Sequence, residues 1–273
     1  MSKKCVTLTD LGLSDDKAVK NINGHHIVCN WYQNPPLTRD TKIYRYMRLS
    51  SLLNMLFDGQ MHISNRQDFS DLREKKGLEK DIESILPFKI VQNYRSIQRQ
   101  EKIKRETLHV CVSCWTLDRR SNNKMDENYL MWKAYSKDEI TCRIGTTIGK
   151  LIESIKDTPA DIVISDVYYA NDMGKNESED LIFQKSLHYE DEQEVRMVVL
   201  SNNRQGADLK IDCKRLLDEI KISPFVPPVL RYFIIRQLNE WCKKYKTLKI
   251  DQSSIMEFIE TNKNYKRTKV SCL

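Results

Sequence analysis

The alternation of apolar and polar positions along the chain predicts short strands and helices in an irregular order. Residues 42–47 are β-branched and aromatic, which is typical of a strand, and leucines recur at helical spacing over residues 49–56. Gly59 then marks a helix end, and residues 60–64 alternate as a second strand. The same criteria predict strands over 107–116, 140–144, 161–169 and 209–211, and helices over 128–135, 147–156 and 228–244.

This order of elements predicts the fold class. Regular alternation of strand and helix is absent, and so is any glycine-rich phosphate loop of the G-x-G-x-x-G or G-x-x-x-x-G-K-[ST] type. Doubly wound nucleotide-binding folds are therefore disfavoured. The pattern favours an α+β fold with antiparallel sheets and flanking helices.

The most informative stretch covers residues 189–200, which begins acidic and ends apolar. If it is one strand, Glu192, Glu194 and Arg196 share one face. The other face then carries Val195, Met197 and Val199. Two carboxylates held close together are costly unless a cation or a ligand compensates their charge. The pattern is thus open to two interpretations: a functional site, or a structural ion pair between Arg196 and one glutamate.

The composition predicts how the chain is organised. Its 273 residues suffice for one large domain, with a loose N-terminal arm over 1–40, a single domain over 41–262 and a basic tail over 263–273. A charged helical insertion is predicted over 75–105. It is either a solvated surface or a basic lid that faces a substrate. Its cations are Lys89, Arg95, Arg99, Lys102, Lys104 and Arg105.

Charge and cysteine content narrow the function classes. The hydrophobic fraction of 40% supports a real core, and the net charge of +7 permits contact with nucleic acid without requiring it. Cys111 and Cys114 form a C-x-x-C motif, but no second pair at zinc spacing accompanies them. The N-terminus has no apolar signal core, and no stretch approaches the length of a membrane span. We therefore expect a cytoplasmic protein with reduced thiols and no membrane partner.

Seven short motifs in register resemble a widespread bacterial domain family of unknown function. The family pattern consists of Tyr-[Lys/Arg]-Tyr, a leucine-rich helix, a strand end Phe-x-Ser-Ser-Pro, a Phe-Asn-Asp-Pro loop, a strand ending Cys-Phe-Ser, then Met-Trp-x-x-Tyr and Glu-x-Glu-x-Arg. Ser70 and Leu72 depart from it, standing where the family has Asn and Pro. The match spans about residues 42–256, and the motifs read Tyr44-Arg45-Tyr46, residues 49–57, His62-Ile63-Ser64, Phe69-Ser70-Asp71, Ser113-Cys114-Trp115, Met131-Trp132-Lys133-Ala134-Tyr135 and Glu192-Gln193-Glu194-Val195-Arg196.

The family pattern in turn resembles the ADP-ribosyltransferase superfamily. That resemblance implies split antiparallel sheets flanked by helices, with NAD as co-substrate and no metal. It implies that Glu194 and Glu192 are catalytic, and that Arg196 neutralises and positions one of them. It also implies cofactor-binding roles for Arg45, Tyr46, Ser64, Trp132 and Tyr135. The helical spacing of the last two aromatics is equally typical of core packing.

The resemblance implies transfer of ADP-ribose to a macromolecule. The basic charge favours a nucleic acid slightly over a protein as acceptor. A bacterial toxin or phage-defence effector, restrained by an antitoxin or inhibitor, would fit this class. Two alternatives remain. One is a nuclease or other RNA-acting enzyme that uses His62, Lys185 and the two glutamates, and the other is a non-catalytic binding module.

Overall fold

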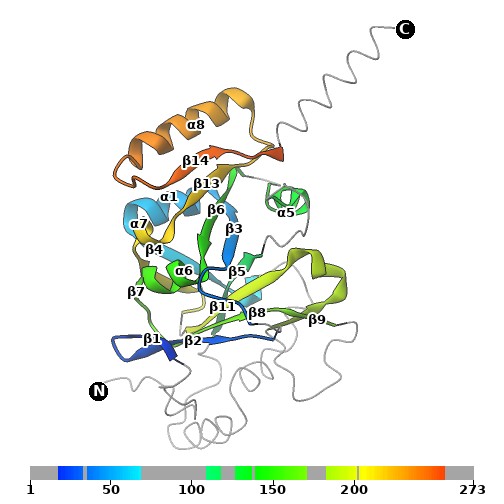
Figure 1. Ribbon diagram of the computed structural model, residues 1–273, viewed down its shortest axis with the longest axis vertical. Helices are drawn as coiled ribbons and strands as arrows, with labels where there is room; N and C mark the ends of the chain where they lie inside the picture. The colour runs from blue at the N-terminus through cyan, green and yellow to red at the C-terminus, as the bar shows by residue number, and fades with distance from the viewer. Residues whose placement is uncertain are drawn as a thin grey trace, which may run out of the picture.

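The computed structural model describes residues 18–32, 36–68, 109–117, 127–136, 139–170, 183–201 and 203–255, and shows an α+β protein built on a large mixed sheet (Figure 1). Twelve strands of the described residues form this sheet, and two more form a small separate one. The loop at 69–71, the insertion at 75–105 and the tail at 263–273 lie outside the described residues.

The main path of the sheet runs β1-β2-β8-β11-β5-β3-β6-β13-β14. Its strands are β1 Ala18–Ile22, β2 His25–Asn30, β3 Lys42–Arg48, β5 His109–Thr116, β6 Thr141–Thr147, β8 Ile162–Asp166, β11 Glu194–Ser201, β13 Glu219–Ile222 and β14 Lys249–Gln252. A branch adds β4 Gln60–Asn65, β12 Ala207–Ile211 and β7 Ile155–Asp157. The small sheet pairs β9 Tyr168–Ala170 with β10 Gln184–Ser186.

The sheet branches along β5, and this branch shapes the candidate site. β11 pairs with β5 over its full length, from Glu194 opposite Thr116 to Ser201 opposite His109. β3 pairs with β5 only at Tyr44 opposite Thr116. Further along β5, β4 pairs with the same edge of β5 as β3 does, with Ser64 opposite Val112. The side chains of β3 and β4 therefore meet beside the middle of β5.

Helices follow the strands as local sequence signals direct. α1 (Leu49–Asp58) ends at Gly59, whose left-handed backbone, with φ of 64°, lets its N–H donate to the Met55 carbonyl. α5 (Tyr129–Tyr135) begins at Asn128, whose side chain accepts from the Leu130 N–H. α6 (Ile148–Ser154), the short α7 (Cys213–Leu216) and α8 (Pro228–Trp241) complete the set, with α8 covering β14 in Figure 1.

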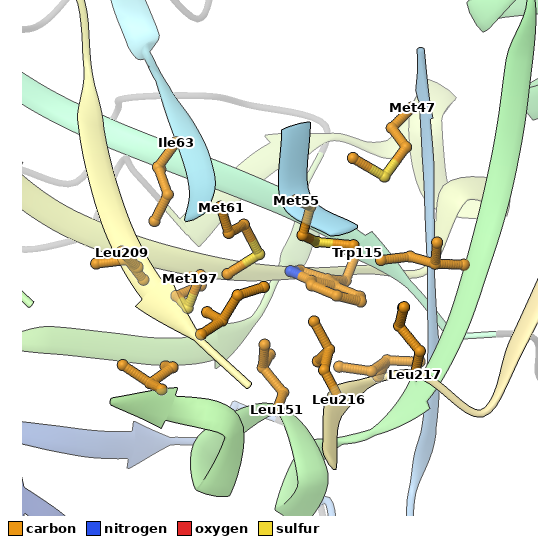
Figure 2. Packing of buried hydrophobic residues seen from close by; sticks show 14 of the residues in the cluster. Met47, Met55, Met61, Ile63, Trp115, Leu151, Met197, Leu209, Leu216 and Leu217 are labelled. Atoms are coloured by element: carbon orange, nitrogen blue, oxygen red, sulfur yellow. The ribbon is translucent and has the colours of Figure 1, made fainter. Parts of the chain in front are cut away.

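The core lies between the sheet and the helices. Figure 2 shows Trp115 of β5 among methionines and leucines of α1, β4, β11 and α7. Met197 presents the apolar face of β11 to this core, together with Val195 and Val199, and all three are fully buried. Alternation along β11 therefore leaves Glu194 and Arg196 on the opposite face, as the sequence predicts.

Two sequence expectations about the fold are corrected. The loose arm over 1–40 is wrong for residues 18–30, because Ile27 and Val28 are buried and β2 pairs in parallel with β8. The large sheet is mixed and not purely antiparallel, since β13 also runs parallel to β14, and the separate small sheet pairs β9 and β10 in parallel. Each of these strands gains its partner from a distant part of the chain, so short-range pattern carries little signal for it.

We expect Gly206→Ala to lower the free energy of unfolding by about 2–4 kcal/mol. Gly206 has φ of 126° in the turn before β12, and an added Cβ would lie 2.4 Å from the Ile63 carbonyl oxygen. Both the backbone conformation and the contact with β4 resist a side chain. Urea unfolding measures the change.

The matched control is Gly24→Ala. Gly24 also has positive φ, at 89°, but nothing lies within 4 Å of its added Cβ. We expect a loss of about 1 kcal/mol there, from backbone strain alone. Equal losses for the two variants would show that the contact with β4 contributes nothing.

Candidate functional site

Glu194 is the centre of the candidate site. It is the first residue of β11, and its side chain is almost fully buried. Arg196 donates two hydrogen bonds of 3.0 Å to it, from Nε to Oε1 and from Nη2 to Oε2. Its backbone N–H donates to the hydroxyl of Tyr169 at 2.8 Å. The predicted contact between Arg196 and a glutamate is therefore present, and its positioning role stays a prediction. This bidentate pair also matches the structural ion pair that the sequence left open.

Glu192 does not share a strand with Glu194. Residues Leu187–Glu192 form a 3-10 helix, and Gln193 adopts a left-handed backbone with φ of 44° before the strand begins. The prediction of one continuous strand over 189–200 is wrong at this point. The physical cause is that the end of β5 and the residue after it bind the carbonyls of this turn. Thr116 Oγ1 donates to the Glu192 carbonyl at 2.6 Å, and the Leu117 N–H donates to the Gln193 carbonyl at 2.8 Å.

Lys185 nevertheless brings the two glutamates together. Its Nζ lies 2.6 Å from Glu192 Oε2 and 3.5 Å from Glu194 Oε2. It comes from β10, which pairs with β9, and sits 4.7 Å from the centre of the Tyr189 ring. A lysine in a short polar segment gave no sequence signal for this bridging position, and it entered the predictions only as a player in the nuclease alternative.

The charges of this network balance, which keeps Glu194 ionised. Burial by itself raises the pKa of the Glu194 carboxyl, but Arg196 and Lys185 outweigh it and lower the pKa to about 2. The Cys114 thiol donates a further hydrogen bond to it. Glu192 is less enclosed, with 28% of its side chain exposed. The site thus holds one fixed carboxylate and one accessible carboxylate.

The three predicted aromatic residues have different surroundings. Trp132 is completely buried, donates from Nε1 to Glu127 Oε2 at 2.9 Å, and packs edge-on against Tyr46 at 4.9 Å between ring centroids. Tyr46 is also buried, and its hydroxyl accepts from the Asn128 N–H. Only Tyr135 is exposed, at 42%, and its ring centroid lies 6.0 Å from that of Tyr46. Only Tyr135 therefore presents a ring to a ligand here.

Arg45 reaches across the branch between β3 and β4. Its Nη2 donates to the His62 carbonyl at 3.3 Å, and its guanidinium lies 6.0 Å from the centre of the Trp115 ring. Its Nη1 is buried and has no hydrogen-bond partner among the described residues. Burial lowers the pKa of Arg45, while Tyr135 and Cys114 act in the opposite direction.

Electrostatic contacts join the predicted residues across the sheet. Although 42% of Tyr135 is exposed, its hydroxyl is enclosed, and this burial raises the pKa of the hydroxyl; Cys114 and Glu194 raise it further. Arg45 lowers the pKa of the same hydroxyl, and Glu192 raises it. Arg45 of β3, Glu194 of β11 and Glu192 of the 3-10 helix therefore all lie within electrostatic range of the Tyr135 hydroxyl on α5.

Ser64 is not joined to this group. It lies on β4 opposite Val112, two positions along β5 from Cys114, and no hydrogen bond connects it to a site residue within the described residues. His62, a player in the nuclease alternative, is exposed and bonds Asp208 at 2.8 Å between Nδ1 and Oδ1. No group of side chains suited to a metal ion occurs among the described residues, Cys111 and Cys114 included.

Glu127 is a buried residue that the sequence analysis missed. It accepts hydrogen bonds from Trp132, from Lys221 Nζ at 2.8 Å, from the Ser253 hydroxyl, and from the N–H and hydroxyl of Ser254 at 2.8 and 2.7 Å. It thereby ties the start of α5 to β13 and to the chain after β14. No periodic signal marks such a residue, because it precedes the helix whose tryptophan it holds.

No protein-family model and no curated protein matches the chain. The family resemblance based on the seven motifs therefore stays a prediction. In the part of the chain that the structure describes, no helix has both the length and the apolar character needed to cross a membrane.

Proposed function

We propose that the protein is an NAD-dependent ADP-ribosyltransferase that modifies a macromolecule. The observation that supports this best is that Lys185 holds the two glutamates together, with Nζ 2.6 Å from Glu192 Oε2 and 3.5 Å from Glu194 Oε2, while both glutamates and Arg45 act electrostatically on the Tyr135 hydroxyl. A guanidinium, an exposed ring and two carboxylates suit a pyrophosphate, a nicotinamide ring and a cationic ribosyl centre respectively. The branched sheet, in which β3 and β4 share one side of β5, is consistent with a split-sheet transferase fold.

The proposed reaction breaks the bond between nicotinamide and the ribose C1′, and the bonding electrons leave with nicotinamide. The ionised Glu194 stabilises the positive charge that develops at the ribose, as a glycosidase carboxylate does. Glu192 accepts the proton of the acceptor nucleophile as the latter bonds to C1′. The buried Nη1 of Arg45 donates a hydrogen bond to an oxygen of the pyrophosphate. Lys185 must leave Glu194 when the cationic ribosyl group arrives.

The acceptor we propose is a nucleic acid, ahead of a protein, on the basis of the net charge of +7. A role as a bacterial toxin or phage-defence effector would make expression arrest growth, and an antitoxin would relieve the arrest. Growth arrest by the wild type but not by Glu194→Gln supports this role. Unhindered growth with folded wild-type protein contradicts it.

A second candidate, a non-catalytic binding module, is favoured by one observation. Both oxygens of Glu194 are held by Arg196, and Lys185 approaches the same carboxylate. In such a module the network would serve stability alone, so replacing both glutamates would leave the cellular activity intact.

We expect Glu194→Gln to reduce NAD consumption and label transfer by roughly 100-fold or more. Purified full-length protein is incubated with NAD labelled in its adenine part and with separate pools of protein, RNA and DNA. Transfer to one pool identifies the acceptor class. RNA cleavage without NAD, or neither nicotinamide release nor transfer from folded wild type, overturns the proposal.

Glu190→Gln is the matched control, because Glu190 is an exposed glutamate on the 3-10 helix that precedes Glu194. It should keep wild-type activity. If Glu194→Gln fails to fold, Tyr135→Ala replaces it, since the exposed Tyr135 ring can be removed without opening the core. That variant should raise the KM for NAD about tenfold, and an unchanged KM would contradict the assigned ring contact.

A further inference from the structure

A pocket of about 390 Å³ lies apart from the candidate site. It is bordered by β1 and the turn after it, the end of α6, β7 and α7. In Figure 1 these elements lie on the left of the molecule, whereas α5 and β9 lie on the right. The volume falls within the range of small-molecule pockets.

The pocket combines an apolar floor with a basic wall. Ile22 and Ile155 are buried and form part of the lining, and Lys20, Lys156 and Arg215 supply three cations. Lys20 is fixed, because its Nζ donates to the carbonyls of residues 152, 153 and 155 at 3.0, 3.1 and 2.6 Å. Its positive charge is therefore held in a fixed position in the wall of the pocket.

The two carboxylates of the lining are already engaged. Glu153 pairs with Arg39 at 2.6 Å. Asp212 caps α7 by accepting from the Lys214 N–H, and its other oxygen lies 3.5 Å from Lys156 Nζ. These contacts leave the pocket with more positive than negative charge.

Arg215 is the cation without a counter-charge. It forms no ion pair and no side-chain hydrogen bond among the described residues, and it is exposed. Burial lowers the pKa of Lys20, and the nearby Arg215 lowers it further. Like charges on one wall repel each other unless an anion lies between them.

We propose that this pocket binds a small phosphorylated molecule that carries an apolar group. The Arg215 guanidinium presents its planar fork to the phosphate. Lys156 exchanges its long contact with Asp212 for a phosphate oxygen, while Lys20 contributes its fixed charge from behind. The apolar group covers Ile22 and Ile155. The pocket does not depend on the proposed transferase activity.

The test uses the full chain and three probes: phenyl phosphate, inorganic phosphate and phenol. Binding is followed by calorimetry and by amide NMR shifts at residues 20–23, 153–156 and 212–215. Phenyl phosphate should bind roughly tenfold more tightly than inorganic phosphate, because it also covers the apolar floor. Phenol alone should show no binding at millimolar concentration. Absence of phenyl phosphate binding, or shifts confined to other residues, overturns the proposal.

Arg215→Gln should weaken phenyl phosphate binding about tenfold or more. Lys214→Gln is the matched control, since Lys214 precedes it on α7, is equally exposed and does not line the pocket. It should bind like the wild type. Equal weakening in both variants would mean attraction to net charge without a defined site, and would overturn the proposal.

Discussion

Replacing Arg196 by methionine is expected to lower the free energy of unfolding by about 3–5 kcal/mol. Arg196 is almost fully buried, and its two hydrogen bonds compensate the equally buried Glu194. Without it, the carboxylate keeps only the 3.5 Å contact with Lys185 and the Cys114 thiol bond. Urea unfolding at pH 7, followed by circular dichroism, measures the loss.

Two further variants identify the cause. Arg39→Met removes an arginine from the exposed pair with Glu153 and should cost about 1 kcal/mol or less. The double variant Glu194→Met/Arg196→Met removes both buried charges and should regain most of the stability lost by the single variant. If Arg196→Met costs no more than Arg39→Met, the buried pair does not stabilise the fold.

This pair also shows why the sequence predicted part of the site. Alternation along β11 is a local property, so it correctly placed Glu194 and Arg196 on the face opposite Val195, Met197 and Val199. The helix over 49–58 was equally readable, because leucine spacing and Gly59 lie within a few residues of each other. These signals need no knowledge of the rest of the chain.

Features that depend on distant contacts were not readable. Glu192 leaves the strand because a non-glycine residue, Gln193, adopts a left-handed backbone stabilised by contacts with residues 116 and 117 of another segment. Lys185 reaches the glutamates from a strand that pairs outside the large sheet. Helical spacing placed Trp132 and Tyr135 on one face of α5, but it could not show that contacts with Tyr46 and Glu127 close the Trp132 ring to ligands.

Glu127 leads to the second large effect, a loss of stability in acid. Burial by itself raises the pKa of its carboxyl, but the hydrogen bonds from Lys221, Ser253 and Ser254 lower the pKa to about 2. The unfolded chain has a glutamate pKa of about 4.3, so folding favours the ionised form. This stability is fully present above the unfolded pKa and disappears as the pH falls from about 5 to 2. A difference of about two pKa units corresponds to about 3 kcal/mol.

Glu127→Gln should therefore be less stable than the wild type by about 3 kcal/mol at pH 7, and the two unfolding curves should converge near pH 2. Convergence is the decisive readout, because a loss of packing would persist at every pH. Glu139→Gln is the control, since the contacts of Glu139 with Arg48 and with the Ser50 hydroxyl are both exposed, and its difference from the wild type should stay within about 0.5 kcal/mol. If Glu127→Gln is less stable than the wild type by the same amount across this pH range, then the packing and hydrogen-bond geometry of Glu127, and not its charge, hold α5 against β13.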